Sequence, residues 1–468
     1  MIENDAFKLL LINLFHLNPD DIANILCTTF NKMMVLLVTL TDKHQACPYC
    51  GFTAPKIKEY VTKEITHSAL TTQKCIIKYR ARRYKCNCCG KTYYEFNPFV
   101  FKSQKISILT VHNILKDLKD FNETFTSVAR RYHVSPTSVS TIFDNHVDIG
   151  RNPLPEIINF DEVYAFKSEK SKYVCVILDF KKQIPVDILP NRKKEYLLNY
   201  FQKIPLEERK KVKYACSDMY EVYRDVVHKV FPSCCMLLDY FHLSQDFHRK
   251  MNEVRIKVMK GYKDNKASDE YYLLKKFNWL LFKNPEDEDK YGRLFDVERE
   301  RKYNSHFKSY MNYYDLRKKL LEINNDLTIC YSLKLELVDF YSKSTIDNAK
   351  VNLEHLIRSC IDTNIDEMIA FSNNLINWKQ EIINSFTIVG TEYKVEADKG
   401  QVVVCNKKVN NAIIENRNKI IKCIKNNANG YTNWSRFRNR VMYVLDPNAT
   451  FSLEPREKQS WMHKTLSN

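Results

Sequence analysis

The sequence predicts an α/β protein, in which a mixed sheet with helices on its faces is interrupted by an all-α insertion and preceded by a cysteine-rich module. Short apolar runs that alternate with helical patterns between residues 157 and 239 predict the sheet. A proline-free stretch between Pro285 and Pro447, with apolar residues at three- and four-residue spacing, predicts the insertion. Paired Cys-x-x-Cys motifs near the N-terminus predict the module.

The strand pattern is clearest after the turn-forming residues 152–155, which mark a domain boundary. We expect three meandering strands, then strand–helix–strand units, at IINFDEVYAF (157–166), YVCVILDF (173–180), IPVDILP (184–190), KVKYACSD (211–218) and CCMLLD (234–239). Helices are expected at 192–203, after residue 218 and after residue 239. The segment 246–385 is expected to be mainly helical, and residues 1–40 also look helical.

The composition favours an acidic partner. The chain of 468 residues has 73 Lys and Arg against 56 Asp and Glu, a formal charge of +17. Such an excess indicates a polyanion, with nucleic acid as the first candidate and an anionic membrane surface as the second. No strongly basic amphipathic helix is set apart for a membrane, so we expect none to be bound.

The N-terminus predicts an intracellular protein. MIENDAFKLLLINLF lacks the basic start and the cleavage site of a signal peptide. The longest apolar run, near MMVLLVTL (33–40), is far shorter than the ~20 residues that span a bilayer. The cysteines number 15, an odd count, so in a reducing compartment they are expected to be thiols or metal ligands.

CPYCG (47–51) and CNCCGK (86–91) predict a structural zinc site. Each motif has a Cys-x-x-Cys turn followed by Gly, and a pair of such turns supplies the tetrahedral thiolate set that zinc prefers. The expected ligands are Cys47, Cys50, Cys86 and Cys89, with Cys88 as a substitute and His67 as a structural residue. The strand-like CIIKYRARRYKC (75–86) lies between them. Its Arg80, Arg82 and Arg83 are expected to contact phosphates, although a basic run is usually only a solvated face.

TFTSVARRYHVSPTSVSTIF (124–143) has the spacing of a helix-turn-helix. Ser135 is a good N-cap and Pro136 suits the first helical position. The expected buried positions are Val128, Ala129, Val134, Val139 and Ile142. The expected DNA-facing side chains are Arg130, Arg131, Thr137, Ser138, Ser140 and Thr141. The alternative is an ordinary helical hairpin in a core.

Aspartates at strand ends predict a magnesium site. Asp161 lies in the first strand and Asp218 ends the fourth, so a sheet that pairs these strands brings both carboxylates together. Such acids bind the hard ions that support phosphoryl transfer. Spacing alone does not separate this pair from Asp179, Asp187 and Asp239, or from the neighbouring Glu162.

The motifs together resemble one known family. They are CPYCG, IKYRARRYKCNCCGKTYYEFNPF and the helix-turn-helix, then FDEVYAFK with Tyr173, SDMY, LLDYFHL (237–243) and NNAIIENRNKIIKCIKNNANGYTNWSRFRNR. This combination, spread over most of the chain, resembles the ISL-three family of bacterial insertion-sequence transposases.

The resemblance implies a ribonuclease-H-like catalytic domain with an Asp-Asp-Glu triad. Carried over motif by motif, the triad is Asp161, Asp218 and Glu415. Asp239 and His242 would support the site, although His242 is as readily a structural histidine. The resemblance also implies two catalytic Mg²⁺ or Mn²⁺ ions beside the structural zinc.

Glu415 has a simpler interpretation as well. In a helix over 411–425 it lies opposite the isoleucine stripe, with Lys419 four residues on and Lys422 seven on. Glu and Lys at this spacing form a surface pair worth only ~0.2–0.5 kcal/mol. Under the family reading, Glu415 is a metal ligand, and Arg417, Lys419 and Lys422 contact phosphates.

The expected domains are 1–45, an N-terminal helical segment; 46–100, the four-cysteine zinc-binding module; 101–150, the helix-turn-helix; 151–245, the first part of the catalytic domain; 246–400, the mainly helical insertion; and 401–468, the last part of the catalytic domain with a C-terminal tail.

The function that follows from the resemblance is DNA transposition. The protein would bind the terminal inverted repeats of its element in double-stranded DNA, then cleave and transfer strands as a homodimer or larger synaptic complex. It would act in the bacterial cytoplasm, associated with the nucleoid. The alternatives are a non-catalytic or repurposed DNA-binding protein derived from a transposase, and a structure-specific nuclease.

Overall fold

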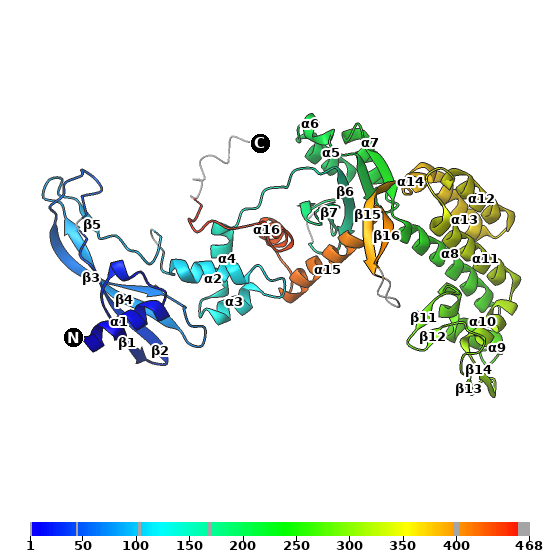
Figure 1. Ribbon diagram of the computed structural model, residues 1–468, viewed down its shortest axis with the longest axis horizontal. Helices are drawn as coiled ribbons and strands as arrows, with labels where there is room; N and C mark the ends of the chain where they lie inside the picture. Colours follow the sequence, from blue (N-terminus) through cyan, green and yellow to red (C-terminus); the bar gives the residue numbers. More distant parts are fainter. Residues whose placement is uncertain (1, 44, 102–103, 167–170, 396–401, 457–468) are drawn as a thin grey trace.

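A computed structural model describes residues 2–43, 45–101, 104–166, 171–395 and 402–456. Figure 1 shows an elongated arrangement, with an N-terminal sheet at one end, a helical insertion at the other and a second sheet between them. Both of these sheets have five strands. Within the described ranges, no helix has the length and apolar character that crossing a bilayer requires.

The N-terminal sheet has the strand order β1-β2-β4-β3, and β5 pairs with the C-terminal end of β4. Its elements are α1 (Ile2–Leu14), η1 (Pro19–Asp21), β1 (Ile22–Phe30), β2 (Met33–Leu40), β3 (Lys56–Thr66), β4 (Cys75–Lys85) and β5 (Thr92–Tyr94). Leu11 and Ile12 of α1, and Phe15 just after it, are buried against one face of β1, β2 and β4. The strand expected at 75–86 is therefore confirmed as β4.

The helical expectation for residues 1–40 is wrong beyond α1. Residues 22–40 form a hairpin whose two turn residues, Asn31 and Lys32, have φ of 48° and 60°. Turns with positive φ match the twist of the flanking strands. Short apolar runs such as MMVLLVTL do not distinguish helix from strand by periodicity, and here the pairing of β2 with both β1 and β4 decides the outcome.

Three helices follow, at α2 (Ile108–Asp117), α3 (Phe125–Arg131) and α4 (Pro136–His146). The Ser135 hydroxyl accepts a hydrogen bond from the Ser138 amide at 3.0 Å, which confirms the predicted N-cap. Val128, Ala129, Val139 and Ile142 are buried as predicted, and Val134 packs against the same core.

The central sheet has the order β10-β9-β6-β7-β8. Strands β6, β7 and β8 form an antiparallel meander, whereas β9 runs parallel to β6 and β10 parallel to β9. The strands are β6 (Ile157–Val163), β7 (Val174–Asp179), β8 (Pro185–Leu189), β9 (Tyr214–Ser217) and β10 (Cys235–Leu238). All five predicted strands are present.

Each face of the central sheet is covered by helices. Helices α5 (Lys194–Gln202) and α7 (Glu221–Val230) pack on the face that includes Ile158 and Phe160, and the short α6 (Leu206–Arg209) lies between them in the chain. Helices α15 (Ala412–Asn427) and α16 (Trp434–Leu445) cover the opposite face. Because side chains alternate along a strand, Asp161 belongs to the face covered by α15.

The insertion leaves the sheet through α8, which continues directly from β10 (Figure 1). Its helices are α8 (Tyr240–Lys260), α9 (Asp269–Lys276), η2 (Asn278–Phe282), α10 (Tyr313–Glu322), α11 (Asn325–Lys343), α12 (Ala349–Asp362), α13 (Asp366–Asn377) and α14 (Lys379–Asn384). They share one apolar core.

The expectation of an all-α insertion needs a correction. Two small hairpins lie at its tip, formed by β11 (Glu288–Asp289) with β12 (Gly292–Arg293) and by β13 (Lys302–Asn304) with β14 (Ser309–Met311). A charged segment without apolar periodicity connects η2 to α10, so it is not expected to form a buried helix.

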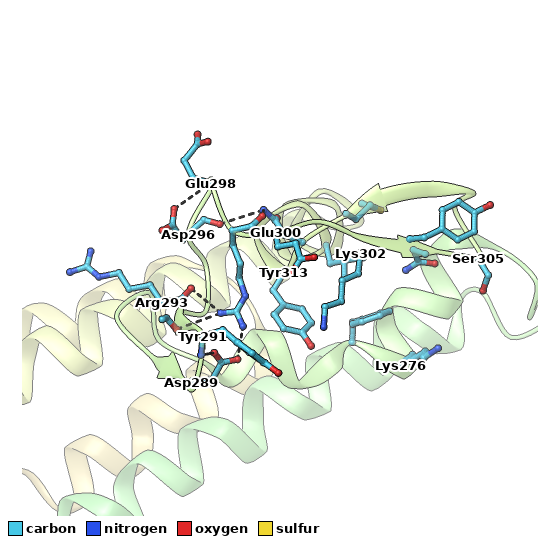
Figure 2. A pocket seen from close by; sticks show the side chains of 18 of the residues that line it. Lys276, Asp289, Tyr291, Arg293, Asp296, Glu298, Glu300, Lys302, Ser305 and Tyr313 are labelled. Carbon is cyan, nitrogen blue, oxygen red and sulfur yellow. Dashed lines mark hydrogen bonds and ion pairs between the residues drawn. The ribbon is translucent and has the colours of Figure 1, made fainter.

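A cavity of about 750 Å³ lies between these hairpins and α9 and α10, and Figure 2 shows the side chains that line it. Its charged groups neutralise one another in part, since Arg299 pairs with Asp289 at 2.6 Å. The cavity lies in the part of the insertion furthest from the central sheet (Figure 1), so it is separate from the carboxylates described below.

The chain returns to the sheet through a two-stranded ribbon, β15 (Ile388–Val395) and β16 (Val402–Lys408), and then enters α15. The helix predicted over 411–425 is therefore confirmed. Ile414, Ile421 and Ile424 are buried against the sheet, and Ile413 and Ile420 are partly buried.

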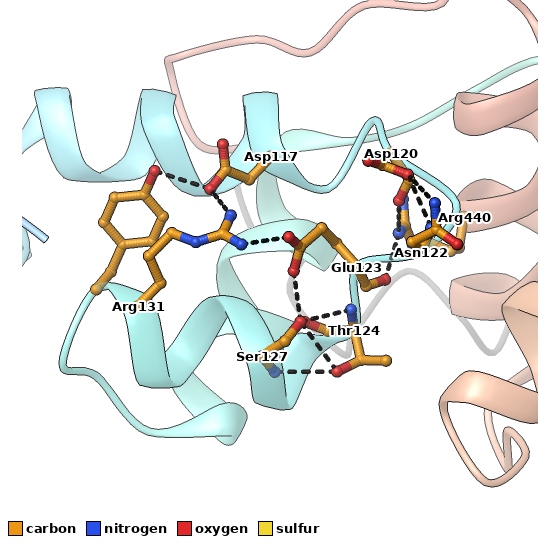
Figure 3. A network of polar contacts seen from close by, with 9 residues as sticks. Asp117, Asp120, Asn122, Glu123, Thr124, Ser127, Arg131 and Arg440 are labelled. Atoms are coloured by element: carbon orange, nitrogen blue, oxygen red, sulfur yellow. Dashed lines mark hydrogen bonds and ion pairs between the residues drawn. The ribbon is translucent and has the colours of Figure 1, made fainter.

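Helix α16 joins the three-helix unit to the central sheet. The Arg440 side chain is almost fully buried, and its Nη2 donates to the carbonyl oxygens of Asp120 and Glu123 at 2.8 and 2.7 Å. Figure 3 shows this arginine at the α2–α3 loop, beside a second network in which Arg131 bridges Asp117 and Glu123. The α2–α4 unit is thus fixed to the sheet by specific polar contacts.

Candidate functional site

Three aspartates, in or just after the neighbouring parallel strands β6, β9 and β10, lie side by side. Asn159 pairs with Cys216, and Cys216 pairs with Leu237, across β6, β9 and β10. Continuing this register by two residues places Asp161, Asp218 and Asp239 side by side and on one face. The structure therefore brings together Asp161 and Asp218, as the sequence predicted, with Asp239, which the family resemblance placed beside the site, as their neighbour.

Helix α15 brings Glu415 to this row. Its N-terminus is held by buried amides, because Asn159 donates to the Asn411 side-chain oxygen at 2.6 Å and Asn411 donates to the Phe160 carbonyl at 3.3 Å. One turn after Glu415, Asn418 Nδ2 donates to Asp161 Oδ2 at 2.7 Å. These contacts fix the face of α15 that carries Glu415.

The side chains of Asp239, His242 and Glu415 form a group with metal-ligand spacing. Each offers one ligand atom, and these atoms lie within 4.8 Å of one another. His242 is in the first turn of α8, and its Nε2 is 3.9 Å from Asp239 Oδ2. Within the described ranges, Glu415 forms no ion pair with Lys419 or Lys422.

Three buried polar atoms at this site lack hydrogen-bond partners and could bind a cation. Asp218 Oδ1, Asp239 Oδ2 and His242 Nε2 are buried and have no hydrogen-bond partner in the described structure. Buried carboxylate oxygens without partners are costly, and Mg²⁺ or Mn²⁺ takes such oxygen ligands. The donor set is therefore chemically suited to divalent metal ions.

The electrostatics of the row support the same interpretation. Burial and then the charge of Asp218 raise the pKa of Asp161 to about 7, with further contributions from Glu415 and Asp239. Burial also raises the pKa of Asp218 and of Asp239. Neighbouring carboxylates raise one another's pKa values, and a cation bound between them would allow all of them to be ionised.

The thiols of Cys47, Cys50, Cys86 and Cys89 also have metal-ligand spacing, with all four sulfurs within 4.8 Å of one another. Gly51 and Gly90 follow the two turns with φ of 72° and 70°, a conformation that favours glycine. The Cys88 and Cys89 amides point at Cys86 Sγ from 3.4 and 3.5 Å, and the Cys89 amide is the main cause that lowers the pKa of the Cys86 thiol to about 7. The cluster matches a structural zinc site, and Cys88 lies outside it.

Comparison with known proteins decides the family. A sequence profile of the ISL3, or ISL-three, family, described as Transposase, matches residues 158–402, which is more than half of the chain. The chain belongs to this family of transposases. The matched residues include Asp161, Asp218 and Asp239 and end before Glu415. A curated relative, the transposase for insertion sequence element IS1001 of Bordetella parapertussis, is 20% identical over 411 residues, which cover 87% of this chain and 91% of the relative.

In this transposase-family chain, α4 corresponds to the second helix of the predicted helix-turn-helix. Some of its polar side chains are exposed, whereas others form hydrogen bonds with neighbouring residues of the same segment. Thr137 and Thr141 are exposed. Ser138 shares a hydrogen bond of 2.8 Å with the capping Ser135, and Ser140 donates to the Thr137 carbonyl at 3.0 Å. The two threonines are therefore the better placed of the four for an external contact.

The predicted phosphate-binding arginines divide in the same way. Arg80 and Arg130 are exposed. Arg82 forms an ion pair with the buried Glu95 at 2.7 Å, and Arg131 pairs with Asp117 and Glu123, so both hold the fold together. Arg83 pairs with Glu59 at 2.6 Å on the surface.

On α15, Lys419 and Lys422 are exposed beside the carboxylate row. Arg417 is directed elsewhere, since its Nε donates to the Gln183 carbonyl at 3.1 Å.

Several side chains that organise the site were missed from the sequence. Asn418 and Asn411 contact Asp161 and the main chain of β6 across more than two hundred residues of sequence. Asparagines in a polar helix carry no signal of such contacts, and only their position one turn from Glu415 could have drawn attention to Asn418. Arg192, which pairs with Glu162, was missed for the same reason.

Proposed function

We propose that this chain is a DNA transposase of an insertion sequence, which binds terminal inverted repeats and catalyses metal-dependent strand cleavage and strand transfer. The observation that carries the proposal is the row of Asp161, Asp218 and Asp239, in or just after the parallel strands β6, β9 and β10, with unpaired oxygens at Asp218 and Asp239. Membership of a transposase family supports DNA as the substrate.

The catalytic domain is proposed to be ribonuclease-H-like. Support comes from the strand order β10-β9-β6-β7-β8, with an antiparallel meander followed by two strands parallel to the first. The proposed acids occupy the first strand, the end of the fourth and a helix packed on the sheet. The domain boundaries proposed from the sequence follow this division, with strands in place of helices for residues 22–40.

We assign the metal-binding roles to Asp161, Asp218 and Glu415. Asp239 and His242 lie within ligand distance of Glu415 and are proposed as supporting groups. The cluster offers enough ligand atoms for two Mg²⁺ or Mn²⁺ ions. When bound, such ions would activate a water or a 3′-hydroxyl and stabilise the leaving oxygen. Asn418 orients Asp161 through its hydrogen bond to Oδ2.

DNA binding is proposed for the zinc module and the helix-turn-helix. Arg80, Arg130, Thr137 and Thr141 are exposed and suited to contacts with phosphates or base edges. Lys419 and Lys422 would contact phosphates beside the acids. Because two element ends must be held together, a homodimer or larger assembly at the bacterial nucleoid is part of the proposal.

The test is a cleavage assay on duplexes that carry the inverted repeats flanking the gene. With Mg²⁺, the proposal expects release of a 3′-hydroxyl end and its joining to a target plasmid. Asp218→Ala should abolish both products and keep binding to the duplex. Binding without metal-dependent cleavage by the wild type would favour a repurposed DNA-binding protein, and cleavage without joining would favour a nuclease.

A further inference from the structure

A row of five aromatic and cationic side chains leads away from the carboxylates. The Arg192 guanidinium carbon lies 4.8 Å from the ring centre of Tyr220 and 4.5 Å from that of Tyr173. The Tyr173 and Tyr164 ring centres are 5.8 Å apart, edge to face. Lys425 Nζ lies 5.1 Å from the ring centre of Tyr164. Each member therefore contacts the next, in the order Tyr220, Arg192, Tyr173, Tyr164 and Lys425.

The row starts at the proposed catalytic acids. Tyr220 follows Asp218 by two residues, and Arg192 forms an ion pair with Glu162, which is next to Asp161 in β6. The other end, Lys425, is on α15, the helix that carries Glu415. A strand bound along the row would thus enter or leave the carboxylate site directly.

The cation at the centre of the row is held in place. Arg192 pairs with Glu162, the neighbour of Asp161, and lies against two tyrosine rings. Its guanidinium is therefore preorganised, so that less side-chain entropy is lost when a phosphate binds.

Two of the three rings are exposed to solvent, whereas Tyr220 is partly buried. Tyr164 and Tyr173 are 51% and 39% exposed, at the loop end of the β6–β7 hairpin, next to the last pair, Val163 with Val174. Single exposed aromatic residues are common on protein surfaces. A connected series of rings and cations beside an active site is a different feature, because it offers several stacking faces in line.

This chemistry fits single-stranded nucleic acid. Aromatic rings stack on unpaired bases, and Arg and Lys between them bind the phosphates. In an intact duplex the bases stack on each other and their faces are closed to a protein ring.

We propose that the row Tyr220–Arg192–Tyr173–Tyr164–Lys425 binds unpaired nucleotides next to the phosphodiester that is cleaved. The inference rests on the proposed function and deepens it, since it names a locally single-stranded segment as the substrate at this site.

The test uses the full-length protein in buffer without Mg²⁺ or Mn²⁺, so that cleavage does not contribute. Fluorescence anisotropy measures the affinity for a short single-stranded oligothymidine and for a duplex of the same length. Tyr164→Ala/Tyr173→Ala should weaken single-strand binding by at least about 10-fold, and change duplex binding much less. The matched control is Tyr303→Ala, a tyrosine that is 58% exposed on β13, whose ring contact is with Tyr310.

A ring-preserving variant keeps the test valid if the alanines disturb the hairpin. Tyr164→Phe/Tyr173→Phe retains both stacking faces and should bind the oligothymidine as the wild type does. Photocrosslinking of a bromodeoxyuridine oligonucleotide to wild-type protein should place adducts on the peptides that contain these tyrosines. Unchanged single-strand affinity in the alanine variant, or equal losses for single strand and duplex, would overturn the proposal.

These outcomes are separable from those of the proposed function. Single-strand binding requires no metal and no cleavage. A chain that binds oligothymidine through the row but never cleaves would retain this inference and lose the catalytic one.

Discussion

At the residue scale, Asn418 is the side chain that fixes Asp161 against α15. Partners that orient a metal ligand typically contribute about 10- to 100-fold to metal affinity or activity. We therefore predict that Asn418→Ala lowers the rate of Mg²⁺-dependent cleavage by about that factor, because the 2.7 Å hydrogen bond to Asp161 Oδ2 is lost. The measurement is the single-turnover cleavage rate as a function of Mg²⁺ concentration.

Asn416→Ala is the matched control, since Asn416 is on the same helix but exposed. It should cleave like the wild type. Equal defects in the two variants would mean that helix propensity rather than the contact with Asp161 is responsible.

The pKa of Asp161 gives a second prediction at this scale. A carboxyl whose pKa is about 7 in the folded protein and 3.8 in the unfolded chain keeps its proton on folding between those values. The stability of the metal-free protein should therefore fall as pH rises through this window and level off above it. Divalent ions compete with that proton, so the increase in Tm produced by Mg²⁺ should be small at pH 6 and larger at pH 8.

Asp218→Asn provides the control, because the charge of Asp218 is the largest cause of this shift after burial. In this variant Asp161 should titrate at lower pH, and Mg²⁺ should raise Tm little at either pH. A thermal shift that is independent of pH in the wild type would contradict the assignment of Asp161 as a ligand.

The sequence could predict Asp161 and Asp218 as acids at strand ends, but spacing could not separate them from other aspartates. The structure supplies the physical difference. Asp179 accepts the Lys181 and Lys182 amides in a turn, and Asp187 binds Tyr200 and Arg438. Their oxygens are satisfied by partners up to about 250 residues away, which no local pattern records.

At the element scale, the question for the zinc module is whether the bound metal stabilises the packing of β3, β4 and β5. The small core at the thiolates contains only Cys47, Tyr84, Cys86 and Tyr93. Such a core gives little hydrophobic stabilisation, so bound zinc should supply much of the folding free energy there. We predict that Cys89→Ser lowers the zinc content and makes the module sensitive to protease.

Cys88→Ser is the matched control, one residue away and outside the thiolate group. It should retain about one zinc ion per chain by elemental analysis. Loss of zinc in Cys88→Ser with retention in Cys89→Ser would reverse the ligand assignment.

The elements differ in how well the sequence predicts them. The strands between 157 and 239 are short, rich in Val and Ile and bounded by turns, and all of them form. The hairpin at 22–40 was missed because its apolar residues suit either structure and its pairing partner, β4, is distant in sequence. Tip hairpins such as β11–β12 are held by turns and ion pairs, which leave no periodic pattern.

At the scale of the whole molecule, the α2–α4 unit is attached to the central sheet through α16 and not by a free linker. Arg440 makes this attachment with its buried guanidinium. We predict that Arg440→Met destabilises the protein by about 2–4 kcal/mol, because the hydrogen bonds from the buried guanidinium to the Asp120 and Glu123 carbonyls are lost. Chemical denaturation measures this, with the exposed Arg130→Met as control.

The same attachment places the proposed DNA-reading helix at a fixed position relative to the acids. Arg440→Met should therefore reduce accurate cleavage at the repeat end more than it reduces binding. A variant that unfolds like the wild type and cleaves at the same position would show that the attachment is dispensable.

The measurement that tests the central claim most directly is cleavage of an inverted-repeat duplex by Glu415→Gln. This change removes one ionised oxygen ligand and almost no volume. The account predicts that the variant binds the duplex like the wild type and releases no 3′-hydroxyl end in Mg²⁺. Cleavage retained at the wild-type rate would return Glu415 to the role of a surface residue and contradict the proposed metal site.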